Sequence, residues 1–514
     1  MKLYKKYTMC VIVLFLVSIF ALLNMLNSKM FIVHDEGISL LASSCHQGIY
    51  YNVGIYNTWV SGEKWKNIIK PEKLFCFLTV ARDLQKTDIH PPFYFWLLHI
   101  FLFIFKKPIF SIILLNYLFL LLSSLFIFLI SKEIFKNNIY PALITVFFIL
   151  SPNTFSTAII ARQYLLLTLV TLIYTFLILK LVNNNSILKY QIFLALTLLV
   201  GILTSYYFII FAGPLTLFLY IYHYIKDKKK LIKITLFLVI ALVVFLLIMP
   251  KFLDQLKREK YQRQDFKVEK ISYRWDKLVK TLIIIFVPEK YSRYSLDYKL
   301  FFKIIIFTSV IVLLLSKLRI LDINLFGLKS KNILVVLFAL IGASIPFILY
   351  MLFLLPRHVM SHQRYVNFFV PFFLILFFKL GTLMNLKNKI MNKVIKSFLI
   401  FVLLFLVFFS FLSKVADVKK SNSNLINLKS KLSSFDYVIV DNFARGSVTT
   451  FIFNFLDERQ GIYIADRIDI MNNYSADSGP NKNKSLVYVA TDNKSKIEIF
   501  KKLQNIYDNV TLLE

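Results

Sequence analysis

The amino-acid sequence predicts a polytopic α-helical membrane protein that ends in a small α/β domain. Of its 514 residues, 58% are hydrophobic, and the mean hydropathy is +0.67. Long apolar runs recur up to about residue 415, which is typical of membrane-spanning helices and not of a soluble core. From about Ala416 the pattern changes to short apolar strands that alternate with helical stretches, which indicates an α/β fold.

About eleven stretches are apolar and long enough to cross a bilayer. The first has a basic start, but Asn24, Asn27 and Lys29 follow it in place of a small-residue cleavage site, so we interpret it as an anchor and not as a signal peptide. The stretch 91–105 is apolar but only about 15 residues long, so we expect a helix at the membrane interface. The predicted spans are roughly 8–27, 109–130, 139–157, 164–182, 190–205, 207–225, 231–249, 299–316, 333–354, 365–382 and 395–415.

The net charge of +33 lies in the membrane part, because the tail from Ala416 holds about 13 basic against about 12 acidic residues. With the spans above, all short loops on one side are basic, which makes that side the cytoplasm and argues against nucleic-acid binding. The opposite, extracytoplasmic face then carries a first loop at 28–108 and the tail. We therefore expect a transmembrane domain at 1–415 and a soluble α/β domain at 416–514.

Three segments of the tail are expected to be strands, namely 435–441, 461–466 and 485–490, with helical stretches at 447–457 and 495–506. No glycine-rich phosphate loop follows the first of these strands, so nucleotide binding is not predicted.

An acidic pair, Asp35 and Glu36, directly follows the first span. Ionised carboxylates beside hydrocarbon are unfavourable unless they are hydrated, paired or metal-bound. Adjacent residues diverge by about 100° on a helix, so the two would meet different partners. One interpretation is that Asp35 acts as a general base toward an acceptor while Glu36 is braced by an arginine or a metal. The alternative is a pair of helix-terminal carboxylates at the headgroup boundary.

A second acidic segment closes the same loop, where Asp88 and His90 precede Pro91 and Pro92. Prolines suit the first turn of a helix, so they would present Asp88 and His90 at a defined angle. The alternative is an ordinary proline-initiated helix with a solvated acidic cap.

Two Arg-containing motifs open later spans on the same face, Arg162 with Tyr164 and Arg364 with Tyr365. A planar guanidinium matches the oxygens of a phosphate group. The alternative for each is an anchor that extends to the interface beside a belt tyrosine. His358 and His362 lie near Arg364, but no acidic partner is nearby, which disfavours a metal site.

The chain has three cysteines. Cys10 lies in the first span, and Cys45 and Cys76 share the first loop. The sequence is compatible with a disulfide between Cys45 and Cys76 and equally with two free thiols.

These motifs, in this order, resemble the bacterial members of the protein O-mannosyltransferase and lipid A aminoarabinose transferase superfamily, the GT-C glycosyltransferases that use polyprenyl-phosphate sugars. The resemblance spans about residues 1–380, and its most specific parts are Asp35-Glu36 and His90-Pro91-Pro92. It implies a GT-C-like fold in a bacterial cell membrane, an extracytoplasmic active site and, usually, an inverting transfer. The acceptor would be a glycolipid, a polysaccharide or a protein, although no insertion typical of the eukaryotic protein mannosyltransferases is recognisable.

By this resemblance Asp35 is the candidate base, with Glu36 and Asp88 as further candidate catalytic acids. Arg162, Tyr164, Arg364 and Tyr365 would bind the donor phosphate, and His90 would be structural or face the acceptor. No metal ligand and no cofactor are assigned, and the resemblance leaves the need for a divalent metal open, because dependence on such a metal varies in the superfamily.

Two other functions compete with this reading. A lipid-linked oligosaccharide flippase or other transporter would keep charged residues near mid-membrane, and the predicted spans contain no such acid. An O-antigen ligase or polymerase usually has its key residues in a large late loop, whereas the acidic motifs here lie in the first loop.

Overall fold

The computed structural model describes residues 2–46, 57–183, 188–261, 321–323, 330–342, 344–345, 348, 363–386, 389–441, 453–465, 470, 474, 484–489, 496–507 and 509–513. The chain divides into two compact units. The first contains Met1–Met25, Asn116–Ile159 and Gln163–Ala416, and the second contains Leu26–Leu115, Ile160–Arg162 and Asp417–Glu514. Residues of the first loop thus pack with the tail, and the chain passes from the first unit to the second after Ala416.

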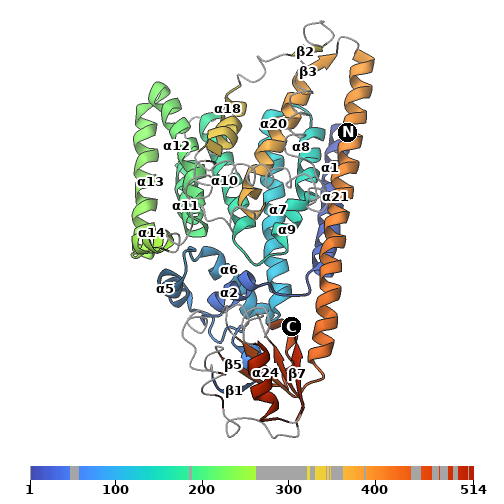
Figure 1. Cartoon of the computed structure of the whole chain (residues 1–514). Coiled ribbons are helices and arrows are strands. Elements are labelled where there is room, and N and C mark those ends of the chain that lie inside the picture. Colours follow the sequence, from blue (N-terminus) through green and yellow to red (C-terminus); the bar gives the residue numbers. More distant parts are fainter. Residues whose placement is uncertain are drawn as a thin grey trace. The chain divides into compact units, whose positions relative to one another are not determined.

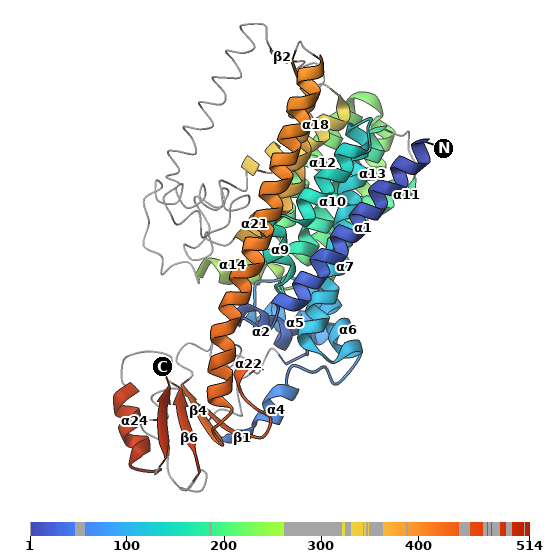
Figure 2. The ribbon, with the colours of Figure 1, turned by 90° about the vertical axis from the view of Figure 1, so that its right-hand side faces the viewer.

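The first unit is built from helices (Figures 1 and 2). The helices that lie wholly or mostly in it are α1 (Lys2–Ser28), α7 (Pro108–Ile134), α8 (Ile139–Ile149), α9 (Pro152–Ala158), α10 (Tyr164–Asn183), α11 (Leu188–Thr204), α12 (Tyr207–Lys226), α13 (Lys228–Ile248), α14 (Phe252–Tyr261), α18 (Lys331–Leu337), the π-helix η2 (Phe338–Gly342), the 3-10 helix η3 (Gln363–Phe369), α20 (Val370–Leu383) and α21 (Lys389–Leu432). A short two-stranded antiparallel sheet pairs β2 (Leu321–Ile323) with β3 (Met384–Leu386).

Seven of the described helices are long and apolar enough to cross a membrane, which confirms the prediction of a polytopic helical protein. An eighth span would consist of α8 and α9, which are bent by 57° at their junction. The bend has a local cause, because Pro152 has no N–H to continue the helix that ends at Ile149. The predicted span at 299–316 lies outside the described residues, and α11 has only 17 residues, so the count of about eleven stays a prediction.

Helix α10 is almost entirely buried in the first unit. A network of amide and hydroxyl groups joins it to its neighbours. Nδ2 of Asn153 in α9 donates a 2.9 Å hydrogen bond to the side-chain oxygen Oδ1 of Asn367 in η3. Nδ2 of Asn367 in turn donates to the Thr168 hydroxyl of α10 at 3.1 Å. Because all three residues are fully buried, these bonds fix η3, which begins beside Arg364, against the start of α10.

The second unit contains the first loop and the tail. The loop forms α2 (His34–Ser43), β1 (Trp59–Ser61), α4 (Gly62–Asn67), α5 (Phe77–Thr87) and α6 (Phe93–Phe105). Helix α6 confirms the short helix expected at 91–105, and it begins after Pro92 at its N-cap. The tail adds β4 (Tyr437–Asp441), α22 (Phe453–Phe455), β5 (Gly461–Ala465), β6 (Leu486–Val489), α24 (Lys496–Gln504) and β7 (Val510–Leu513).

The five strands form one sheet in the order β1-β5-β4-β6-β7, drawn mostly in red in Figure 1. The four tail strands are parallel, as expected of an α/β domain, and the three predicted strands are confirmed. Strand β1 comes from the first loop and lies beside the tail strands (Figure 2). It pairs antiparallel with β5, with Trp59 opposite Tyr463. The sequence analysis did not predict β1 or β7.

The sheet is held by an aromatic and aliphatic core. Burial of such side chains contributes most of the stability of a small domain. The core of the tail consists of Ile439, Tyr463, Ile470, Tyr474, Leu486, Tyr488, Ile499, Leu503 and Tyr507. Trp59 of the loop packs against this core, with its ring 5.4 Å from the rings of Tyr437 and Tyr463. The first loop is therefore part of the same hydrophobic unit as the tail.

Candidate active site

The acidic pair lies in the first turn of α2. Val33 is the N-cap, and the Glu36 side chain accepts a 2.7 Å hydrogen bond from the Val33 N–H. Carboxylates in a first turn satisfy free backbone N–H groups and interact favourably with the helix dipole. The helix start therefore explains why two acids follow the first span, and it places Asp35 and Glu36 on different sides of the turn.

Glu36 is fully buried and has three partners. Lys29 contacts it at 2.5 Å, and the Ala161 N–H donates to its other oxygen at 2.8 Å. A buried carboxylate is tolerated when a cation and hydrogen bonds compensate for its lost hydration. The prediction that an arginine or a metal braces Glu36 is wrong, because Lys29 takes that place. Glu36 also ties the start of α2 to the segment 160–162.

Asp35 points to another partner. Its carboxylate lies 3.3 Å from Nη2 of Arg162, and its side chain is one-third exposed. The expected divergence of the two acids is therefore present. Since Asp35 keeps solvent access while Glu36 does not, Asp35 is the member of the pair that an acceptor can reach.

Arg162 is 94% buried, as 6% of its surface is exposed. Its Nη2 meets Asp35, whereas Nε and Nη1 have no hydrogen-bond partner among the described residues. Leaving buried guanidinium donors unpaired costs free energy, so native structures usually pair them. This arrangement suits an anionic ligand with several oxygens, such as a phosphate.

Asp88 and His90 form a local pair at the end of α5. The Asp88 carboxylate accepts a 2.7 Å hydrogen bond from Nδ1 of His90 and a 2.6 Å bond from the Ile89 N–H. Burial alone would raise the pKa of Asp88. The charge and hydrogen bond of His90 oppose this effect, and with the charge of Arg162 and the Ile89 N–H they lower the pKa to about 2. Asp88 is thus ionised and orients the His90 ring.

The guanidinium of Arg162 acts on residues from both acidic motifs. It contacts Asp35 directly, and its charge lowers the pKa of Asp88. Burial lowers the pKa of His34, and the charge of Arg162 lowers it further, whereas the charge of Asp35 raises it. Asp35, Asp88 and Arg162 therefore share one electrostatic environment in the second unit.

The other predicted phosphate-binding residues lie in the first unit. The Arg364 guanidinium lies 5.4 Å from the Tyr164 ring centre and 5.7 Å from that of Tyr365. The two tyrosine rings are 5.0 Å apart, and Tyr207 adds a third ring at 5.7 Å from Tyr365. Aromatic rings within about 6 Å of a guanidinium attract it through cation–π interactions. Arg364, Tyr164 and Tyr365 are thus neighbours, whereas action of Arg162 and Arg364 on one phosphate stays a prediction.

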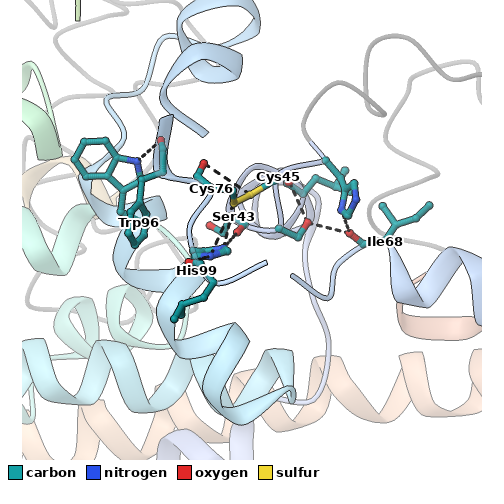
Figure 3. The surroundings of a disulfide bond; sticks show 11 residues. Ser43, Cys45, Ile68, Cys76, Trp96 and His99 are labelled. Atoms are coloured by element: carbon teal, nitrogen blue, oxygen red, sulfur yellow. Dashed lines mark hydrogen bonds between the residues drawn. A yellow bond between two sulfur atoms is a disulfide. The ribbon is translucent and has the colours of Figure 1, made fainter. Parts of the chain in front are cut away.

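Cys45 and Cys76 form a disulfide, with their Cα atoms 6.5 Å apart (Figure 3). His99 lies beside it, and the ligand atoms of these three residues lie within 4.8 Å of one another. The group does not suit a metal ion, because the sulfur atoms are bonded to each other and both His99 nitrogens meet backbone carbonyls, of Ser43 at 2.7 Å and of Leu74 at 2.8 Å. The disulfide instead joins α2 to the start of α5. A divalent metal elsewhere in the site stays a prediction.

Two residues of the site were missed by the sequence analysis, Lys29 and Asn454. Lys29 gave a usable signal, because a lysine directly at the end of an apolar span and close to an acidic pair can form an ion pair. Asn454 gave no such signal, because it forms hydrogen bonds with Ile32, which lies 422 positions away in the sequence.

Comparison with known proteins gives a match of part of the chain to one family model and a similarity in fold to solved structures. Residues 89–252 match the family model of dolichyl-phosphate-mannose-protein mannosyltransferases. This segment includes His90, Arg162 and Tyr164. No curated protein sequence matches the chain.

Among solved structures, ArnT from Cupriavidus metallidurans bound to undecaprenyl phosphate is similar in fold. The TM-score is 0.50 at 9% identity, over 97% of this chain and 89% of that chain. The structure of ArnT from the same organism in the apo state gives a TM-score of 0.48 at 12% identity, over 99% and 90%. The match over residues 89–252 and the shared fold confirm the predicted resemblance of this chain to the GT-C glycosyltransferase superfamily.

Proposed function

We propose that this chain is a membrane glycosyltransferase that moves a sugar from a polyprenyl-phosphate donor to an extracytoplasmic acceptor. The observation that carries the proposal is the contact between Asp35 and the buried Arg162, whose Nε and Nη1 have no hydrogen-bond partner among the described residues. One group can accept a proton and the other can bind phosphate oxygens. The family match over residues 89–252 supports the same reaction class.

The proposed chemistry follows from the charges of these groups. The acceptor hydroxyl attacks the anomeric carbon of the sugar, and its proton passes to Asp35. The bond between the anomeric carbon and the phosphate oxygen breaks, and the polyprenyl phosphate leaves with the electron pair. Because this leaving group is already anionic, it needs positive charge and not a proton, and Arg162 supplies that charge. The attack opposite the leaving group makes the transfer inverting.

Glu36 and the Asp88–His90 pair support this centre in the proposal. Glu36 holds the 160–162 segment through the Ala161 N–H, so it keeps Arg162 in place. Asp88 fixes the ring of His90, which then presents its other nitrogen to the acceptor. The membrane holds the lipid tail of the donor, so the site has only the headgroup to orient.

We propose further that the protein lies in a bacterial inner membrane with this centre and the tail on the extracytoplasmic side. The basic short loops support this orientation. The Cys45–Cys76 disulfide supports it as well, because disulfides persist in oxidising compartments. The acceptor would then be a glycolipid, a cell-surface polysaccharide or a protein.

The experiment that tests the function starts with the host. Deletion of the gene should cause the donor, a lipid-linked sugar, to accumulate, and mass spectrometry of extracted lipids would identify it. That lipid, added to the purified protein with host envelope acceptors, should yield free polyprenyl phosphate. A transporter would move the lipid without breaking the sugar–phosphate bond. An absence of both accumulation and bond cleavage would contradict the proposal.

A further inference from the structure

The segment that carries the candidate base is held by the tail of the chain. Residues 29–33 form no helix or strand between α1 and α2, so their backbone groups need partners elsewhere. Asn454 supplies two. The Ile32 N–H donates to Oδ1 of Asn454 at 2.7 Å, and Nδ2 of Asn454 donates to the Ile32 carbonyl at 2.6 Å. The amide thus binds Ile32 as a neighbouring strand would.

Two further contacts hold the same segment. The ring of Phe455 stacks on that of Phe31, with centroids 5.6 Å apart and both residues buried. Asn422 of α21 donates a 2.7 Å hydrogen bond to the Ser28 carbonyl. Asn422 and Asn454 are both more than nine-tenths buried, so these bonds are shielded from competing water.

The position of these contacts matters for the site. Ile32 directly precedes Val33, the N-cap of α2, and Asp35 follows in the first turn. The backbone at Ile32 therefore sets where α2 starts and where the Asp35 carboxylate meets Arg162. Lys29, the partner of Glu36, lies between the two contact points, Ser28 and Ile32. Movement of this segment would disturb both ion pairs.

We propose that Asn454 is a positioning residue for the sugar transfer, and that the α/β tail acts through it to hold Asp35 against Arg162. This inference rests on the proposed function. It gives the tail a role in catalysis that needs no ligand of its own. A shift of about 1 Å in a catalytic group can lower a rate by about a hundredfold, so loss of this clamp should be visible in turnover.

The test compares Asn454→Ala with Gln460→Ala in the full-length protein. Gln460 is a matched control, because the hydrogen bonds of its buried side-chain amide to described residues all stay within the tail. They join it to the Leu432 and Phe435 carbonyls and to the Asp457 N–H. We expect Asn454→Ala to lower kcat about tenfold or more, with KM for the donor changed less than about threefold. Gln460→Ala should lower the unfolding temperature while kcat stays near that of the wild type.

Hydrogen exchange gives a readout that does not depend on activity. The amides of residues 32–40 should exchange faster in Asn454→Ala than in Gln460→Ala. If Asn454→Ala fails to fold, Asn422→Ala removes only the bond to Ser28 and should show the same changes to a smaller extent.

The outcomes separate the two proposals. Wild-type protein that releases no polyprenyl phosphate from the accumulated lipid would overturn the proposed function. Active wild-type protein together with unchanged kcat in Asn454→Ala would overturn the positioning role alone. A fall in kcat that matches the fall in unfolding temperature equally for Asn454→Ala and Gln460→Ala would also overturn it, since the effect would then be general destabilisation.

Discussion

Nη2 of Arg162 lies 3.3 Å from the Asp35 carboxylate, and the same guanidinium leaves Nε and Nη1 without a hydrogen-bond partner among the residues that the structure describes. The two residues come from distant parts of the sequence, and Glu36 joins those parts by accepting the Ala161 N–H. The proposed reaction needs an acid–base group and a phosphate-binding cation side by side, and this pair provides them.

Replacement of Asp35 by Asn should abolish sugar transfer while the protein still inserts and folds. The amide keeps the shape of the side chain but cannot accept a proton, and a positioned base contributes about 10²–10⁴ in rate. Release of polyprenyl phosphate from the lipid-linked sugar measures the effect. Asp83→Asn is the matched control, because Asp83 lies in the same loop on α5 and is only partly buried. Turnover of Asp35→Asn at the level of Asp83→Asn would rule out the assignment of the base.

Arg162→Ala should weaken binding of the donor phosphate. Removal of a charge-assisted donor costs about 1.5–3 kcal/mol, so affinity for polyprenyl phosphate should fall roughly tenfold to a hundredfold. Arg364→Ala tests the second predicted phosphate residue, and Arg162→Lys tests whether the planar fork is needed. Direct binding of polyprenyl phosphate to the purified variants gives the measurement. Unchanged affinity in both alanine variants would remove the idea of a phosphate site at these arginines.

Much of this site follows from local sequence patterns, and the rest depends on contacts that only the folded chain creates. Asp88, His90 and the prolines interact within five positions, so their mutual orientation could be predicted. Three of the four tail strands, β4, β5 and β6, were recognisable because each is a short apolar run between other segments of the tail. Strand β1 has only three residues and owes its existence to pairing with β5, so it carries little signal of its own.

Two of the three partners of Glu36, Lys29 and the Ala161 N–H, show the same limit. A carboxylate beside a membrane needs a cation, which the sequence predicts, but many cations are available in a chain with 61 lysines and arginines. The structure selects Lys29, which directly follows the last helical residue of α1, Ser28. Ala161 could not be predicted as a partner, because its contribution is a backbone N–H.

Glu36→Gln should destabilise the protein strongly. The amide has a single acceptor oxygen, so it can keep only one of the hydrogen bonds from the Val33 and Ala161 N–H groups. It also leaves the buried Lys29 ammonium without its counter-charge. Breaking a buried ion pair by removing one partner costs about 3–5 kcal/mol. The unfolding temperature in detergent should fall, and the double variant Lys29→Met with Glu36→Gln should recover part of the loss. A double variant no more stable than Glu36→Gln would contradict this account of the pair.

The Asp88–His90 pair predicts how stability responds to acid. Because the pKa of Asp88 is lowered from 3.8 to about 2 in the folded protein, its ionised form stabilises the fold at pH values above about 4. That contribution should be lost as the pH falls from about 4 through about 2, where the folded carboxylate takes up its proton. Thermal unfolding of wild type and Asp88→Asn across this range gives the test. The difference between them should shrink as the pH falls from about 4 toward 2. A difference that grows as the pH falls would mean that the folded state does not favour ionised Asp88.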